Sequence, residues 1–154
     1  AAVLQLVHDA FGRWDESDLI TELYQGEEVL FGLVAEDETG IIGHILLSTL
    51  EVNSAHLALE AAALAPVAVL PDRQKEGVGQ KLINAAIQQC RNLEHMAGII
   101  VLGDPNYYNR FGFSSETASR LEAPFEGEHF MALEFRSDVL PDGGKVSYPK
   151  AFGL

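Results

Sequence analysis

The sequence predicts a mixed α+β fold in one domain. Two helical patterns open the chain, two apolar runs joined by a polar turn follow, and a strand–helix–strand pattern comes next. The chain has 154 residues, a length at which one domain buries about 68–70% of its unfolded surface. We therefore expect residues 1–154 to form a single domain, with a mostly antiparallel sheet and one right-handed β-α-β unit.

Two short helices are expected at the start of the chain. In residues 1–11 apolar side chains recur every three or four positions, which gives one apolar helical face, and Gly12 follows as a stop. Residues 15–25 repeat this spacing, and Gly26 closes the second helix.

Antiparallel strands are expected next. The apolar runs 29–35 and 41–50 flank a polar turn that contains Gly40, a pattern typical of a hairpin. A third strand is expected over residues 56–70. Pro66 interrupts this strand, and because proline has no N–H to donate, it predicts a bulge or an unpaired edge there.

The second half of the chain completes the predicted crossover. A long helical pattern covers residues 77–93, and the short apolar run 98–102 is typical of a buried strand. Residues 104–111 predict a short helix rich in aromatic side chains. Residues 128–136 predict a late strand.

Composition excludes several classes of function. The chain has 23 acidic against ten basic residues and a net charge of −13, which argues against binding to nucleic acid. The charge favours cationic partners, or it serves only solubility. No apolar run reaches the roughly 20 residues that span a bilayer, and the histidines show no metal-ligand spacing. The single cysteine, Cys90, fits a reducing, cytoplasmic setting.

The segment 67–82 carries the clearest chemical signal. Its strand ends near Val69, a turn follows, and Gly77 and Gly79 open the long helix. The first N–H groups of a helix lack intrahelical partners and bear partial positive charge, so the segment is suited to bind a phosphate or pyrophosphate. A dinucleotide fingerprint does not fit, because Leu82 stands where its third glycine belongs. The alternative is an ordinary glycine-containing helix start.

Two motifs resemble those of the GCN5-related N-acetyltransferase (GNAT) superfamily. Residues 74–79 read QKEGVG, similar to the family's Q/R-x-x-G-x-G/A motif, and residues 108–113 read YNRFGF, similar to its Y-x-x-x-G-F segment. Residues 101–108, 123–125 and 148–152 resemble a bacterial subgroup of YhbS-like acetyltransferases. The resemblance begins within the family's first helix, so we expect the family's usual first strand to be missing from the given sequence.

The resemblance implies acetyl-CoA as co-substrate. The strand before the motif would splay from its neighbour and bind the pantetheine arm through its backbone, and the helix start would hold the pyrophosphate. Lysine side chains there would offset the phosphate charge, and a family asparagine that is absent at Val101 would be replaced by Asp104 or Asn106. The implied binding residues are Val67, Ala68, Val69, Gln74, Lys75, Glu76, Gly77, Val78, Gly79, Gln80, Lys81 and Asn106.

The resemblance also implies catalytic roles. Tyr108 stands at the family's general acid, which protonates the leaving thiolate, and a phenol pKa near 10 suits that role; the alternative is aromatic packing. The Val69 N–H would polarise the acetyl carbonyl. Some relatives carry a glutamate as base where this chain has Ala63. Glu60, acting through water, and His44 are the remaining candidates; the alternatives are an exposed strand carboxylate for Glu60 and a packed or hydrogen-bonded structural histidine for His44.

The sequence therefore predicts an N-acetyltransferase that moves an acetyl group from acetyl-CoA to a primary amine by direct attack. The acceptor would be a small-molecule amine or a protein amino group. One alternative is a catalytically inactive CoA-binding sensor or interaction domain, and another is a regulator that binds ATP or NAD. Homodimers are common in the superfamily, so a homodimer is possible here.

Overall fold

A computed structural model describes residues 2–154. Its six-stranded sheet has the order β1-β2-β3-β4-β5, with β6 paired to β2. The strands are β1 (Val29–Asp37), β2 (Gly40–Asn53), β3 (Ala58–Val69), β4 (Met96–Leu102), β5 (Phe130–Glu134) and β6 (Lys145–Ser147). The helices are α1 (Ala2–Phe11), α2 (Asp15–Gln25), α3 (Val78–Arg91), α4 (Pro105–Tyr108) and α5 (Ser115–Ala118), with 3₁₀ turns η1 (Pro71–Arg73), η2 (Asn109–Phe111) and η3 (Lys150–Phe152).

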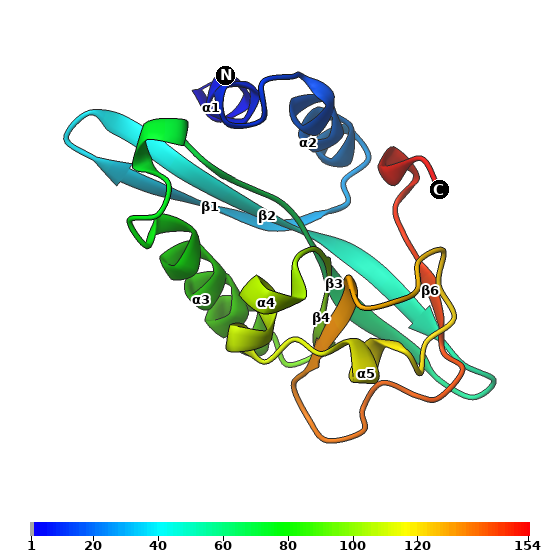
Figure 1. The fold of residues 1–154 in the computed structure, drawn as a ribbon. Helices are drawn as coiled ribbons and strands as arrows, with labels where there is room; N and C mark the ends of the chain where they lie inside the picture. Colours follow the sequence, from blue (N-terminus) through cyan, green and yellow to red (C-terminus); the bar gives the residue numbers. More distant parts are fainter. Residues whose placement is uncertain (1) are drawn as a thin grey trace.

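Helices cover both faces of the sheet (Figure 1). Helices α1 and α2 and the C-terminal turn η3 lie on one side, and α3 and α4 lie on the other. On the α3 side, Ile83 and Ala86 pack against Ile45, Leu47 and other buried residues of the strands. The opposite face carries two further apolar clusters, one of them under α1 and α2. This arrangement confirms the predicted α+β class.

The pairing of β2 with β3 contains the predicted bulge. Ile45 lies opposite Val67, whereas Leu47 lies opposite Leu64, so β3 has one more residue than β2 in this stretch. The extra residue falls at Pro66, as expected for a residue without an N–H.

The pairing of β3 with β4 stops short of the ends of both strands. The two strands are parallel, as a β-α-β unit requires, and their last paired residues are Ala63 and Ile100. Beyond this pair β3 continues to Val69 and β4 to Leu102. Within the described part of the chain, these last residues of β3 and β4 form no ladder with each other, so the strands separate at one end of the sheet.

Two elements escaped the sequence prediction because they are short. Helix α5 has only four residues, and its start is capped by Ser114, whose Oγ accepts the Thr117 N–H at 3.2 Å. Strand β6 has three residues and is held by pairing with β2. Neither is long enough to show a periodic pattern of apolar residues. The last predicted strand is also shorter than expected, spanning only the five residues of β5.

We expect the contact of α3 with the sheet to supply much of the fold's stability. Ile83 is fully buried in this contact, so Ile83→Ala should lower the free energy of unfolding by about 2–5 kcal/mol. Gln88→Ala, on the exposed face of the same helix, should change it by less than about 0.5 kcal/mol. Urea denaturation measures both, and equal losses would contradict this account of the core.

Candidate active site

A pocket of about 490 Å³ lies where α3 begins. Gly77 forms the N-cap of α3 with a φ of +87°, a left-handed conformation that glycine adopts without strain. The Lys81 N–H donates to the Gly77 carbonyl at 3.1 Å, so the N–H groups of residues 78–80 have no helical acceptor. The pocket is lined by Val69, Arg73, Gln74, Lys75, Gly77, Gly79, Gln80, Tyr107 and Arg110.

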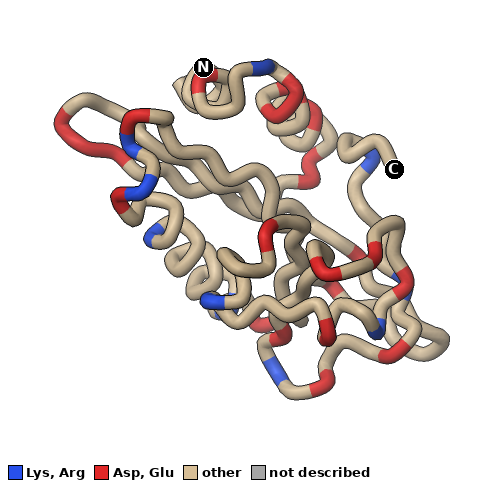
Figure 2. Tube along the Cα trace, in the orientation of Figure 1, with Lys and Arg blue, Asp and Glu red and all other residues tan. Residues whose placement is uncertain are grey.

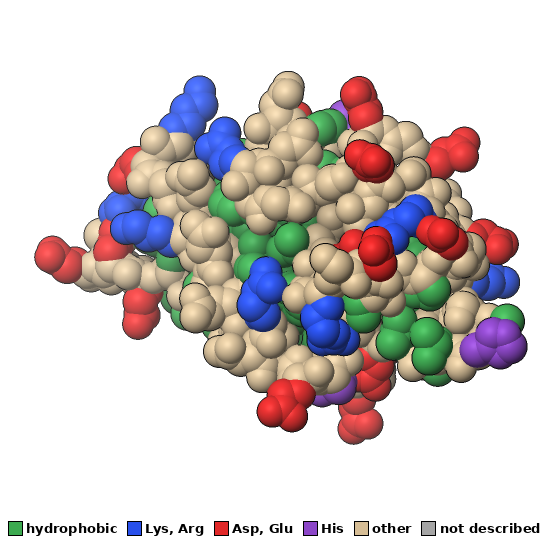
Figure 3. Space-filling view, turned by 90° about the horizontal axis from the view of Figure 1, so that it is seen from below, with side chains coloured by type: hydrophobic (Ala, Val, Ile, Leu, Met, Phe, Trp, Pro, Cys, Tyr) green, Lys and Arg blue, Asp and Glu red, His purple; other side chains and the backbone are tan. Residues whose placement is uncertain are grey.

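Three cationic side chains line this pocket in an otherwise acidic chain. Arg73 and Lys75 come from the loop before α3, and Arg110 comes from η2. Arg73 is paired with the Asp37 carboxylate, and the Arg110 guanidinium lies 5.0 Å from the centre of the Tyr107 ring. Lys and Arg gather around the start of α3 and over part of this side of the molecule (Figures 2 and 3). The donor set fits a pyrophosphate.

Sequence reasoning did not assign Arg110 to the pocket, although it lies within the motif at residues 108–113. Tyr107 lines the same pocket. An added Cβ at Gly79 would lie 3.1 Å from the Tyr107 hydroxyl, so this hydroxyl sits directly beside the helix start. A larger residue at position 79 would crowd both the tyrosine and any phosphate bound there.

The unpaired end of β3 directs a backbone donor into the gap beside β4. The Leu70 N–H donates to the Ile42 carbonyl at 2.9 Å, so this residue faces β2. Because successive residues of a strand alternate, the Val69 N–H faces away from β2. The Val69 carbonyl points the same way and accepts the Gln74 side-chain amide at 3.1 Å. The Val69 N–H therefore faces the gap beside β4, and its role as oxyanion donor stays a prediction.

Several predicted binding residues do not line the pocket at α3. Ala68 is buried under α1 and α2, and Val78 packs against the main core. Glu76 and Lys81 are exposed beside the pocket. The Asn106 N–H donates to the Asp104 carboxylate at 2.9 Å, an N-cap contact that fixes the start of α4.

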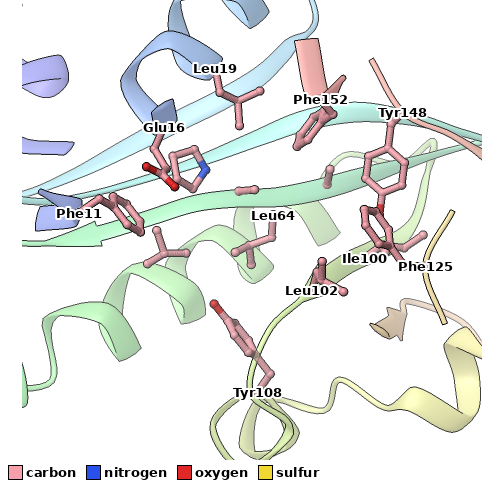
Figure 4. A pocket seen from close by; sticks show the side chains of 14 residues that line it. Phe11, Glu16, Leu19, Leu64, Ile100, Leu102, Tyr108, Phe125, Tyr148 and Phe152 are labelled. Atoms are coloured by element: carbon pink, nitrogen blue, oxygen red, sulfur yellow. The ribbon is translucent and has the colours of Figure 1, made fainter. Parts of the chain in front are cut away.

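A second pocket, of about 420 Å³, lies at the separated ends of β3 and β4 (Figure 4). The Tyr108 hydroxyl points into it, and Val67 lines its wall. Tyr107 and Tyr108 are thus adjacent in α4 but line different pockets, and their rings meet edge to face at 5.1 Å. The full lining is Phe11, Glu16, Leu19, Ala63, Leu64, Ala65, Pro66, Val67, Ile100, Leu102, Tyr108, Phe125, Tyr148 and Phe152.

Burial keeps the Tyr108 phenol protonated. Desolvation raises its pKa to about 12, and the neighbouring Tyr107 adds to the rise. The hydroxyl therefore remains a proton donor at neutral pH. Its ring is held against Gly103, where an added Cβ would come within 2.5 Å of the ring. Only glycine at position 103 leaves room for the ring in this orientation.

The predicted base candidates lie elsewhere. Glu60 is 57% exposed and its carboxylate lies 3.0 Å from His95 Nε2, and it does not line either pocket. His44 is buried, and its Nδ1 has no hydrogen-bond partner. Desolvation lowers the pKa of His44 to about 4, so the imidazole is neutral at physiological pH. The structure does not bring either residue together with Tyr108.

Comparison with known proteins decides the family. The model of the acetyltransferase (GNAT) family matches residues 1–113 of this chain. The chain belongs to the GNAT family. This confirms the predicted GNAT resemblance and the prediction of an acetyltransferase. Among residues 2–154, no group of side chains is arranged to hold a metal ion, and no helix is long and apolar enough to cross a bilayer.

Two Escherichia coli K12 proteins are similar in sequence. The uncharacterized N-acetyltransferase YjhQ is 36% identical over 106 residues, which cover 68% of this chain and 58% of YjhQ. The match therefore spans little more than half the length of that relative. The uncharacterized N-acetyltransferase YhbS is 29% identical over 151 residues, which cover 96% of this chain and 89% of YhbS. This similarity confirms the predicted YhbS-like subgroup.

Solved structures of two GNAT proteins share the fold. YhbS from Escherichia coli, in complex with CoA, matches with a TM-score of 0.87 and 26% identity over 99% of this chain and 85% of that one. A GNAT acetyltransferase from Brucella melitensis, in complex with acetyl-CoA, matches with a TM-score of 0.76 and 32% identity over 97% of this chain and 89% of that one.

The buried His44 should make stability depend on pH. Its pKa of about 4 lies below the ordinary value of 6.5, so the unfolded chain binds more protons between these values. Stability is therefore lost as the pH falls through this window. Between about pH 7.5 and 5.5 the wild-type protein should lose roughly 1–2 kcal/mol more than His44→Leu. Urea denaturation at both pH values measures the free energy of unfolding of the two proteins. Equal losses in wild type and His44→Leu would contradict the role of His44.

Proposed function

We propose that the protein transfers the acetyl group of acetyl-CoA to a primary amine across the unpaired ends of β3 and β4. One observation carries this proposal: a cationic pocket and a mostly apolar pocket meet the same stretch of β3, with Tyr107 at one and Tyr108 at the other. The first pocket suits the pyrophosphate of acetyl-CoA. The second suits the amine and the reacting thioester.

The binding residues follow from the first pocket. The N–H groups of residues 78–80, with Lys75, Arg73 and Arg110, would hold the pyrophosphate. The free backbone edge of residues 67–69 would pair with the amides of the pantetheine arm. The two solved relatives described above contain CoA and acetyl-CoA, which supports this assignment.

The reaction needs one bond to form and one to break. The ammonium group first loses one proton to water. The resulting neutral amine attacks the thioester carbon and forms the C–N bond, while the Val69 N–H stabilises the developing oxyanion. The C–S bond then breaks, and Tyr108 donates its phenol proton to the departing sulfur. The second proton of the amine nitrogen returns through solvent to Tyr108. The products are an amide and CoA, with one proton released overall for each ammonium consumed.

Glu60 as the base stays a prediction from the sequence. Its side chain is exposed and lies against His95, so its position does not support direct proton transfer in the pocket at Tyr108. We propose instead that water in the open pocket removes the amine proton. The acceptor is a small-molecule amine or a protein amino group. The cytoplasmic location, the homodimer and the limits of the domain remain predictions from the sequence.

Tyr108→Phe should lower kcat roughly 10²-fold, because a phenyl group has no proton to donate to the thiolate. Its affinity for acetyl-CoA should stay near that of the wild type. Tyr107→Phe is the matched contrast, since this hydroxyl lies at the helix start, and it should raise KM for acetyl-CoA more than it lowers kcat. Steady-state assays of CoA release measure both. A wild-type protein that binds CoA but acetylates no amine would instead support the sensor alternative.

Arg110→Gln should raise the Kd for CoA about tenfold, because it removes a charge-assisted hydrogen bond to the pyrophosphate. Its Kd for pantetheine, which lacks the pyrophosphate, should not change. Arg91→Gln serves as the charge-matched control, since Arg91 lies at the far end of α3 against Phe135. Calorimetric titration measures these constants. If Arg110→Gln weakened the binding of CoA and of pantetheine equally, Arg110 would not contact the pyrophosphate.

A further inference from the structure

The pocket beside Tyr108 has a composition that acetyl-CoA binding does not explain. Its volume, about 420 Å³, is in the range of pockets that hold small molecules. An acetyl group would fill only a small part of it. Most of its lining is aliphatic or aromatic, contributed by both ends of the chain as well as by β3 and β4.

Glu16 is the only side chain with a formal charge among the fourteen described residues that line this pocket. Its side chain is 17% exposed, and its carboxylate accepts two hydrogen bonds from Arg13, at 3.0 Å from Nε and 2.5 Å from Nη2. These hydrogen bonds lower the pKa of Glu16, so the carboxylate is charged at neutral pH. A carboxylate has about four acceptor sites, so two remain for another donor.

The far wall of the pocket is aromatic. The Phe125 and Tyr148 rings meet edge to face at 5.7 Å, and the Tyr148 and Phe152 rings lie 5.3 Å apart. Burial raises the pKa of Tyr148 to about 12, so this phenol is neutral. In Figure 4 these rings lie at one end of the cavity, Glu16 reaches in from α2 toward the other end, and the Tyr108 hydroxyl lies between them on the opposite side of β3.

Building on the acetyl transfer proposed above, we propose that this cavity binds the acceptor, a primary amine with an aryl or similarly apolar body. Glu16 binds the ammonium group, and Phe125, Tyr148 and Phe152 contact the body. An acceptor with a carboxylate beside its amine is disfavoured, because Glu16 repels it and no lining residue supplies a positive charge. The net charge of −13 also raises the local concentration of cations.

An acceptor panel with acetyl-CoA tests the class of substrate. Phenethylamine should show a kcat/KM about 10- to 100-fold above that of ethylamine, since a phenyl ring is buried in one case only. Its kcat/KM should exceed that of phenylalanine, which carries an additional carboxylate, by a similar factor. Mass spectrometry of the acetylated amine and assay of the released CoA thiol provide the readouts.

Variants at the start of α2 test the role of Glu16. Glu16→Gln should raise KM for phenethylamine at least tenfold and leave the Kd for acetyl-CoA unchanged. Arg13→Gln should lower that KM, because it frees the carboxylate for the amine. If the Arg13–Glu16 ion pair were purely structural, both substitutions would change KM for phenethylamine in the same direction. Asp18→Asn, an exposed acid on the same helix, is the charge-matched control and should behave as the wild type.

Several results would overturn the proposal. Ethylamine or phenylalanine used as efficiently as phenethylamine would exclude an apolar acceptor site. A kcat/KM that rises with acyl chain length up to octanoyl-CoA, with no selectivity among amines, would assign the cavity to the acyl chain. If CoA binds but no amine is acetylated, the proposed transfer fails. Calorimetric titration of phenethylamine into the CoA complex then tests whether the cavity binds amines. Binding that is weakened by Glu16→Gln supports an amine site, and the absence of binding overturns the proposal.

Discussion

The site depends on the interruption of one parallel strand pair. Strands β3 and β4 stop pairing after Ala63 and Ile100, and the bulge at Pro66 lies three residues further along β3. Proline has no N–H, and a bulge turns the following residues, so the ladder with β4 cannot continue in register. The backbone groups of Val67 and Val69 on this edge are left to find other partners. The Val69 carbonyl accepts the Gln74 side-chain amide, and the amides of the substrate are suited to pair with the remaining groups.

One short helix places a tyrosine hydroxyl at each of the two pockets. Helix α4 has only four residues, and Asp104 caps its start. Because successive residues of a helix point about 100° apart, Tyr107 and Tyr108 are directed to different sides. One hydroxyl therefore lies at the cationic start of α3 and the other in the apolar pocket. Gly103 is needed for this arrangement, since a side chain at position 103 would occupy the space of the Tyr108 ring.

The sequence predicted most of the long elements and the chemical motif, because both depend on local patterns. Helices α1–α3 and the bulge at Pro66 followed from periodicity and from the chemistry of single residues. Arg110 and Glu16 could not be assigned in this way. Their roles depend on which distant segments meet in the fold, and no spacing along the chain encodes the approach of α2 to β3 or of η2 to α3. The same limit left Glu60 as a candidate base, since sequence distance from the motif says nothing about where a side chain points.

The distribution of charge separates the two substrates. The excess of acidic residues repels anions from most of the surface, whereas Arg73, Lys75 and Arg110 make the start of α3 locally cationic. An anionic pyrophosphate is therefore favoured at one pocket only. The other pocket presents a single carboxylate in an apolar wall, so it disfavours a second phosphate and favours a cation. In the proposed reaction the two substrates are sorted by charge to opposite sides of the strand gap, so the amine and the thioester would meet beside Tyr108 with little competition between them for either pocket.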